Sequence, residues 1–268
     1  MFQKVLASFG SGGAQIDCRI LDRTTHPGRP LRGEVQLLGG EVEQAINALS
    51  VSLMARTQAV GERGQERTED VVFGTQQLVG RELVRPGQQI RVPFEVPLPW
   101  EMPISSFFGK PLTGVGVGLQ TTLDIENAVA DPVDLDAAAV EPLPVQKRIL
   151  DAVSKIGFTF SDAVLRKGQI GGTSQSLPFY QEIRFAPSPR FAKVFTRLAI
   201  TFLTRADHTQ VILDVNKKVR VSKSGGFAGA ADYCGSFGVK HNDPKPPAWE
   251  QQLEGWLHEL AKPRGIFD

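Results

Sequence analysis

The strongest constraint on the fold of this chain is an alternation of apolar and polar residues that recurs along most of its length. The segment "HPGRPLRGEVQLLGG", residues 26–40, is a clear example. Between a Pro-Gly turn signal and a pair of glycines, four residues share one side of an extended backbone: Leu31, Gly33, Val35 and Leu37. Successive side chains of a strand point to opposite faces, so this period of two predicts a half-buried β-strand. We therefore interpret the flanking glycines as turn residues and not as a phosphate-binding loop.

A second alternating segment, residues 89–98, adds information about position within a sheet. Its apolar face consists of Ile90, Val92, Phe94, Val96 and Leu98. Two prolines, Pro93 and Pro97, fall on the other face. Proline has no amide hydrogen and is largely confined to edge strands, so we expect this strand at a sheet edge.

The clearest alternation is "GVGVGLQTTLDIE", residues 114–126. One face carries Val115, Val117, Leu119, Leu123 and Ile125. The other carries Gly114, Gly116 and Gly118, which indicates close approach of another backbone. The stretch resembles a phosphate loop only superficially, because the strand pattern continues through it instead of leading to a helix N-terminus.

Turn-rich segments divide the chain into blocks. We predict an N-terminal β-domain over residues 1–140, a second β-domain over 141–243 and a Pro-rich linker with an amphipathic helix over 244–268. The Pro-, Asp- and Ala-rich run 129–144 marks the first boundary. Residues 61–70 contain no apolar side chain and are expected to form an exposed hairpin loop. The glycine-rich stretch 222–238 is expected to be a mobile loop or edge region.

Three short segments have helical periodicity. Phe2, Val5, Leu6 and Phe9 predict a short N-terminal helix that packs on the following domain, with a weak membrane or partner contact as the alternative. At the domain junction, a helix face is formed by Val145, Ile149, Ala152, Val153 and Ile156, and Gly157 is placed to end it.

The third helix, near the C-terminus, follows three prolines. Its apolar positions are Trp249, Leu253, Trp256, Leu257 and Leu260. Two tryptophans on one face bury a large area, so we expect this helix to be docked. It either packs on its own domain or provides a partner or homodimer contact through Trp249, Leu253, Trp256 and Leu257.

Composition excludes several classes of partner. The 30 basic and 29 acidic residues leave a formal net charge of +1, which gives no long-range field for nucleic acid. The first ten residues are too short to span a bilayer, so we expect no integral membrane association. The two cysteines, Cys18 and Cys234, form no CxxC pair, and a reducing cytoplasm fits best.

No catalytic, metal-binding or cofactor-binding residues are predicted. The four histidines, His26, His208, His241 and His258, have no partner at the spacing of a helical metal pair. Asp131, Asp134 and Asp136 could in principle bind calcium, but their spacing matches no calcium loop. We interpret these aspartates as a flexible acidic turn between domains and expect the protein not to be an enzyme.

One loop keeps a different kind of function open. Residues 98–114 contain Trp100, Phe107 and Phe108 in a long connection. These aromatic side chains could stack on a carbohydrate or another small ligand, or they could cap the open end of a sandwich. A small-molecule-binding module is therefore the alternative to a protein-binding one.

The sequence resembles the bacterial sporulation-control protein family. The resemblance is carried by residues 26–56, 83–99, 118–142, 157–165 and 178–191, and it covers most of residues 1–220. The segment "GVGVGLQTTLDIENAVADPVDLDAAAVEP", 114–142, is its most specific part, whereas the glycine-rich stretch and the Trp helix match less clearly.

This resemblance implies an all-β protein with two consecutive arrestin-like, immunoglobulin-like β-sandwich domains. It also implies a non-enzymatic regulatory or adaptor role in the cytoplasm, exercised through contacts with other proteins. A tendency to form homodimers, through an edge strand or the Trp helix, is a further expectation. The family supplies no catalytic residues to transfer to this chain.

Overall fold

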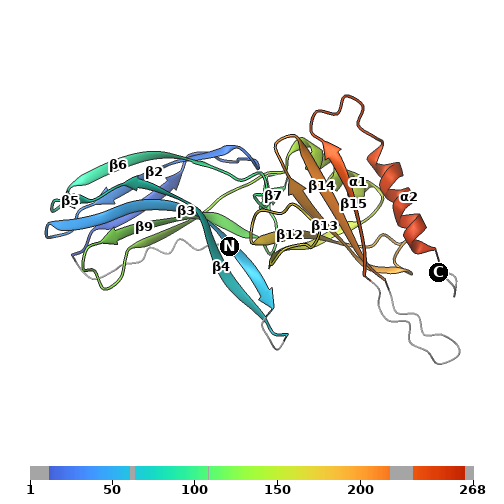
Figure 1. The fold of residues 1–268 in the computed structure, drawn as a ribbon, viewed down its shortest axis with the longest axis horizontal. Coiled ribbons are helices and arrows are strands. Elements are labelled where there is room, and N and C mark those ends of the chain that lie inside the picture. The colour runs from blue at the N-terminus through green and yellow to red at the C-terminus, as the bar shows by residue number, and fades with distance from the viewer. Residues whose placement is uncertain (1–11, 61–63, 108, 218–231, 263–268) are drawn as a thin grey trace. The chain divides into compact units, whose positions relative to one another are not determined.

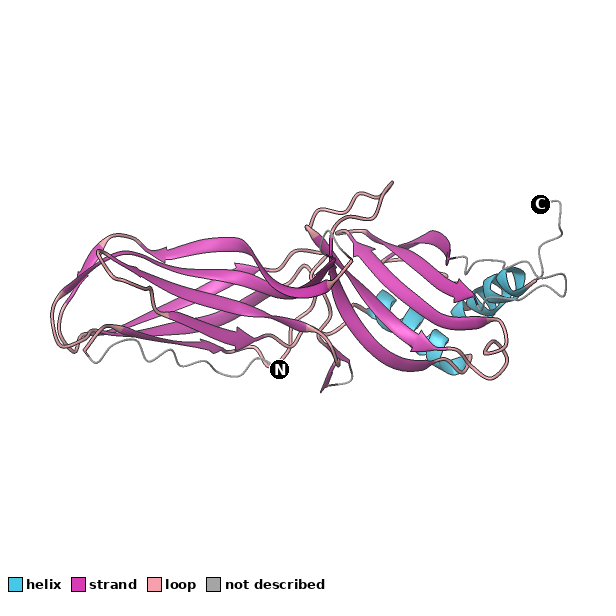
Figure 2. Cartoon of the chain, turned by 90° about the horizontal axis from the view of Figure 1, so that it is seen from below, coloured by secondary structure: helices cyan, strands magenta, loops and turns pink. Residues whose placement is uncertain are grey.

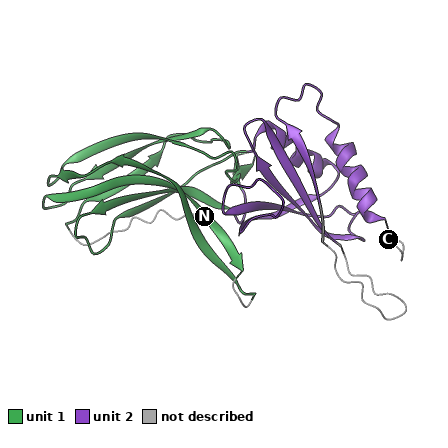
Figure 3. Ribbon diagram, viewed as in Figure 1, with its two compact units in different colours: residues 1–111, 115–141 green, residues 112–114, 142–268 purple. Residues whose placement is uncertain are grey.

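A computed structural model of the chain describes residues 12–60, 64–107, 109–217 and 232–262. It divides into two compact units (Figure 3): unit 1 contains residues 1–111 and 115–141, and unit 2 contains residues 112–114 and 142–268. The division after Glu141 falls within the Pro- and Ala-rich run of the sequence. The predicted N-terminal helix at residues 2–9 and Phe108 lie outside the described residues.

Unit 1 is a β-sandwich (Figures 1 and 2). One sheet has the order β1–β2–β6. The other has the order β10–β9–β3, and β4 and β5 also pair with β3. The short strands β7 and β8 pair with each other. The strands are β1 (Gln15–Ile20), β2 (Pro30–Leu38), β3 (Gln44–Val60), β4 (Glu66–Val79), β5 (Glu82–Val84), β6 (Gln89–Pro97), β7 (Ser106–Phe107), β8 (Lys110–Pro111), β9 (Gly116–Ile125) and β10 (Val133–Ala137). The all-β class predicted from the sequence is confirmed.

Strand β2 follows the alternation of its sequence. Leu31, Val35 and Leu37 are buried, with at most 2% of each residue exposed. Gly33 is opposite Phe94 of β6, and a Cβ atom on Gly33 would lie 2.2 Å from the tip of that ring. The aromatic ring therefore fills the space that the missing side chain leaves.

The glycine and proline signals also have the structural roles that the sequence predicts. Strand β6, which contains Pro93 and Pro97, pairs with β2 at the edge of its sheet. On β9, a Cβ atom on Gly118 would lie 2.0 Å from the backbone oxygen of Asp136, so the neighbouring strand does approach closely. Gly28 and Gly87, each after a proline, have φ angles of +74° and +65°, which favour glycine.

Two expected loops of unit 1 are partly strands. Residues 66–70 begin β4 instead of completing an exposed loop, because their backbone pairs with β3 from Val60 to Arg56. The charged side chains that suggested a loop lie on a sheet edge. Charged residues protect such an edge from unwanted pairing, which explains their presence in a strand.

The acidic segment at the end of unit 1 is likewise not a flexible turn. Asp134 and Asp136 belong to β10, and Asp134 is only 3% exposed. Asp134 Oδ2 accepts a 2.7 Å hydrogen bond from the backbone N–H of Cys18, which links β10 to β1 of the other sheet. Asp131 Oδ1 accepts one from the N–H of Ile125 at 3.1 Å. The carboxylates of Asp131 and Asp134 thus accept hydrogen bonds from backbone N–H groups.

Unit 2 contains one antiparallel sheet with the order β11–β12–β13–β14–β15 and two helices. Helix α1 and helix α2 accompany this sheet (Figures 1 and 2). The elements are α1 (Pro144–Lys155), β11 (Thr159–Lys167), β12 (Phe179–Ala186), β13 (Phe195–Thr204), β14 (His208–Lys217), β15 (Asp232–Lys240) and α2 (Trp249–Ala261).

Helix α1 begins and ends where its sequence predicts. Pro144 occupies the first turn, and Gln146 Oε1 accepts a 2.8 Å hydrogen bond from the N–H of Leu143. Gly157, with φ +92°, follows the last turn. The buried face includes Ile149 and Val153, neither of which is exposed to solvent.

The glycine-rich stretch 222–238, expected to be a mobile loop or edge region, contains an edge strand. Residues 218–231 lie outside the described part of the chain, but residues 232–240 form strand β15. Its register with β14 runs without interruption from His208↔Lys240 to Asn216↔Asp232. A strand with so many small residues has little periodicity of its own, and pairing with β14 determines its conformation.

Candidate peptide-binding groove

Helix α2 is anchored to β15 by aromatic contacts. The rings of Trp249 and Phe237 are stacked, with centroids 5.4 Å apart and an angle of 24° between their planes. Two turns further along the packed face, Trp256 lies so close to Gly235 that a Cβ atom on this glycine would be 2.6 Å from the indole. Gly235 thus allows the helix to approach the strand.

Ion pairs and a second ring contact hold the other side of α2 within unit 2. Glu250 Oε1 accepts a 2.8 Å hydrogen bond from Lys155 Nζ of α1, and Glu254 pairs with Arg190. The His258 ring packs against Phe191, with centroids 5.1 Å apart. Both charge pairs are solvent-exposed, so they orient the helix more than they stabilise it.

The four α2 residues predicted to make a partner or dimer contact are therefore engaged by their own chain. Trp249, Leu253 and Leu257 are 6%, 3% and 2% exposed, and Trp256 is half-buried over Gly235. Of the two arrangements that the sequence left open, the structure has the helix packed on its own unit. A partner that binds here must use the surface beside these side chains.

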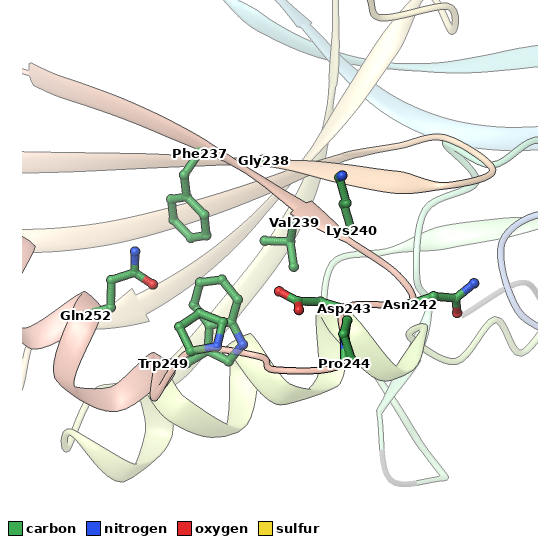
Figure 4. Close-up of a pocket in the computed structure, with 10 residues that line it drawn as sticks. Phe237, Gly238, Val239, Lys240, Asn242, Asp243, Pro244, Trp249 and Gln252 are labelled. Carbon is green, nitrogen blue, oxygen red and sulfur yellow. The ribbon is translucent and has the colours of Figure 1, made fainter.

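A groove with a volume of about 660 Å³ lies beside this contact (Figure 4). Residues from β15, from the turn after it and from the start of α2 line the groove: Phe237, Gly238, Val239, Lys240, Asn242, Asp243, Pro244, Pro247, Trp249 and Gln252. Its apolar surface comes from the two aromatic rings, Val239 and the prolines. All of these residues belong to unit 2.

Trp249, which lines the groove, has an unused hydrogen-bond donor. Its Nε1 atom is buried and has no hydrogen-bond partner among the residues that the structure describes. Buried polar groups are normally paired, and an unpaired donor costs about 1–3 kcal/mol. A ligand with an acceptor atom in the groove would remove this cost.

The start of α2 adds further donors. The residue before the helix, Ala248, has no side-chain acceptor, and no side chain caps the first turn through it. The first intrahelical bond shown here runs from the N–H of Gln252 to the oxygen of Ala248. Amides earlier in the turn have no acceptor within the helix. The first turn of α2 therefore holds donors that no backbone oxygen of the helix accepts from.

An acceptor lies opposite these donors. The carboxylate of Asp243 points towards the indole of Trp249 in Figure 4. Asp243 Oδ1 accepts a 2.9 Å hydrogen bond from the backbone N–H of Lys245, which fixes the turn after β15. The groove therefore offers both a donor and an acceptor above an apolar floor.

The predicted ligand-binding aromatic residues of the 98–114 loop do not form a comparable site in the described residues. Trp100 is half-buried, and its ring lies over Gly28, where a Cβ atom would be 2.4 Å away. Phe107 is half-buried in β7 and lies opposite Lys110. Trp100 thus has a packing role in unit 1.

Titratable side chains provide no visible reactive centre within the described ranges. No group of three or more His, Cys, Asp or Glu side chains is arranged to hold a metal ion there. The histidines bond separately: His26 to the oxygen of Glu141, His208 to Asp207, His241 to Thr209 and His258 to the oxygen of Glu254. Burial raises the pKa of the Cys18 thiol from 9.0 to about 12, which keeps it protonated.

No helix in the described part is long and apolar enough to cross a membrane.

Sequence reasoning did not find the groove. It identified the α2 face from its periodicity but described the β15 residues only as a mobile loop or edge region. The missing signal was the short alternation of Phe237 and Val239 with Gly238 and Lys240, which is too short to predict a strand alone. The groove arises because β15 and α2 meet through tertiary packing.

Comparison with known proteins identifies the family. The family described as "SpoOM protein" matches residues 2–219. The sporulation-control protein Spo0M of Bacillus subtilis (strain 168) is 29% identical over 220 residues, which cover 82% of this chain and 81% of that protein. The crystal structure of Spo0M from Bacillus subtilis matches with a TM-score of 0.75 and 23% identity, and covers 92% of this chain and 99% of that chain. This structural likeness shows that the fold is shared.

The groove residues, which run from Phe237 to Gln252, all follow the end of the family match at residue 219. The family resemblance noted in the sequence is confirmed over the part of the chain that precedes them. The chain therefore belongs to the SpoOM protein family.

Proposed function

We propose that this protein is a non-enzymatic regulatory adaptor that acts in the cytoplasm, in sporulation or related cell development, through contacts with other proteins. The relative in Bacillus subtilis is a sporulation-control protein, which supports the process. The observation that carries the adaptor role is the groove between β15 and α2, where an unpaired indole N–H is combined with an apolar floor.

Two properties of the groove favour a macromolecular partner over a reaction. Its lining contains no cysteine, serine or histidine; its charged side chains are Lys240 and Asp243, and the Asp243 carboxylate accepts a hydrogen bond from the backbone N–H of Lys245. The described cysteine, Cys18, is buried in unit 1 and remains a thiol at neutral pH. Binding without chemistry is the function that such a surface supports best.

The proposal can be tested by cross-linking in cells. A photo-reactive amino acid replaces Gln252, which is exposed and lines the groove; the matched control replaces Gln251, which is exposed but does not line it. We expect position 252 to give discrete cross-linked proteins during growth or sporulation, and position 251 to give fewer. Equal or absent cross-linking at the two positions, with the variant protein present at normal levels, would contradict the adaptor role of the groove.

A further inference from the structure

The sheet edges of the protein differ in how they are protected. Strand β6 is at an edge and contains Pro93 and Pro97, which cannot donate to an added strand. Strand β4 begins with charged residues at positions 66, 67, 69 and 70, which oppose pairing with another strand. Strand β15 is the last strand of its sheet, carries charged residues only at its two ends and has Ser236 and Gly238 at its centre. The central part of this edge has neither proline nor charge.

The register of β15 shows which of its backbone groups face outwards. The N–H of His241 donates to the oxygen of Asp207, in line with the β14–β15 ladder. Because antiparallel strands alternate between bonded and non-bonded pairs, Val239 and Phe237 pair with β14 in the same way. The N–H and C=O groups of Ser236 and Gly238 then point away from β14, and no described strand pairs with them.

The side chains of this strand divide in the same regular way. Val239 is buried and Phe237 is half-buried on the face that α2 covers, whereas Ser236, Gly238 and Lys240 are exposed on the other face. A Cβ atom on Gly238 would meet no heavy atom within 4 Å, so the face of β15 away from α2 is open at this point. The groove thus lies beside a strand whose outward backbone groups pair with no described strand.

We propose that β15 binds an extended peptide segment of a partner protein as an added strand. The peptide backbone pairs with the outward groups of Ser236 and Gly238, and one of its side chains enters the groove against Phe237, Val239 and Trp249. The bound peptide uncovers Trp249 Nε1, which is buried in the free protein, and one of its carbonyl oxygens accepts a hydrogen bond from this atom. This inference rests on the proposed adaptor function and specifies the kind of partner.

The chemistry of the groove matches a peptide backbone better than a free anion or a helix. An added strand presents donors and acceptors in alternation, as the edge of β15 does. A free anion would face the carboxylate of Asp243, which lines the same groove as the indole N–H. A helix satisfies its own backbone groups and would leave those of Ser236 and Gly238 unpaired.

The test uses the full-length protein and a displayed library of random peptides. Enriched peptides are synthesised with a fluorescent label, and their affinities are measured by polarisation. Two variants remove a predicted contact each: Trp249→Phe removes the indole N–H and retains an aromatic ring on Phe237, and Gly238→Pro removes an outward-facing amide. Gly171→Pro, in an exposed turn with no atom near its Cβ position, is the matched proline control.

We expect each groove variant to weaken peptide binding about fivefold to tenfold, the loss that corresponds to one hydrogen bond. The Gly171→Pro variant should bind like the unmodified protein. Thermal unfolding first checks that the Trp249→Phe protein is folded. This variant removes a donor that has no described partner, so it still tests the proposal if Gly238→Pro unfolds the protein. Equal affinity of all variants, or no enriched peptide, would overturn the proposal.

Two further results separate this inference from the proposed function. If sedimentation shows a dimer that Gly238→Pro abolishes and peptides do not bind, the edge pairs with a second copy of the chain, and the peptide proposal is wrong. If cross-linking from position 252 captures partners equally in the Gly238→Pro background, the adaptor function stands and strand addition fails. Peptide binding without any cellular cross-link from position 252 would support strand addition and contradict the adaptor function of the groove.

Discussion

The indole of Trp249 stacks on the phenyl ring of Phe237, with ring centroids 5.4 Å apart. This contact joins the first residue of α2 to the last strand of the sheet in unit 2. It has two consequences, because it both docks the helix and builds the floor of the groove. The indole ring is buried and well packed, but its N–H has no hydrogen-bond partner among the described residues.

The close approach of α2 to β15 predicts an asymmetric response at two glycines of one strand. Gly235→Ala should lower the free energy of unfolding of unit 2 by about 1–3 kcal/mol, because its new methyl group would lie 2.6 Å from the Trp256 ring. Gly238→Ala is the matched control, since its Cβ position has no atom within 4 Å, and it should change stability by less than about 0.5 kcal/mol.

Urea unfolding of the two variants, compared with the unmodified chain, measures this difference. A greater loss for Gly238→Ala than for Gly235→Ala would contradict the docking of Trp256 on the strand.

Two turn glycines of unit 1 allow backbone strain to be separated from packing. Gly28 and Gly87 both have positive φ, +74° and +65°, so alanine costs about 1–2 kcal/mol at either position. At Gly28 the added methyl group would also lie 2.4 Å from the Trp100 ring, whereas at Gly87 it would meet nothing within 4 Å. Gly28→Ala should therefore be more destabilising than Gly87→Ala by about 1–3 kcal/mol.

Calorimetry of both variants tests this prediction. Equal losses would contradict the packing of Trp100 on Gly28.

The Cys18 thiol should respond to pH as a buried acid. Burial raises its pKa to about 12 in the folded protein, whereas the unfolded thiol titrates near 9.0. The folded state thus retains its proton over a range in which the unfolded state loses it. The stability that this contributes is present below pH 9 and is lost as pH rises towards 12.

At neutral to mildly alkaline pH the same shift makes the thiol unreactive, because the thiolate is the nucleophile. We expect iodoacetamide at pH 8 to label Cys18 only after unfolding in urea, as followed by peptide mapping. Rapid labelling of Cys18 in the folded protein would show that the thiol is accessible and ionised, contrary to its buried position on β1.

Much of the fold follows from local patterns in the sequence. The faces of β2 and β6, with their turns, and the buried sides of α1 and α2 are all readable from periods of two and 3.6. They are predictable because each such element buries one regular face. Pro93 and Pro97 even indicate the edge position of β6, since proline lacks the donor that a central strand requires.

The remaining features depend on contacts between distant segments. Asp134 looks like a solvated acidic residue in the sequence, but it is buried because the N–H of Cys18, far away along the chain, needs an acceptor. Strand β15 looks like a glycine-rich loop, yet Gly235 is required where Trp256 approaches and β14 supplies the register. The groove forms where β15 and α2 meet, so the sequence of neither segment alone predicts it.

The central claim is that the outer edge of β15 is open for another strand, and residue-resolved amide hydrogen exchange of the full-length protein tests it most directly. The account predicts rapid exchange for the amides of Ser236 and Gly238 and slow exchange for those of Phe237 and Val239, which pair with β14. Under conditions in which sedimentation shows a monomer, equal protection of all four amides would contradict the account.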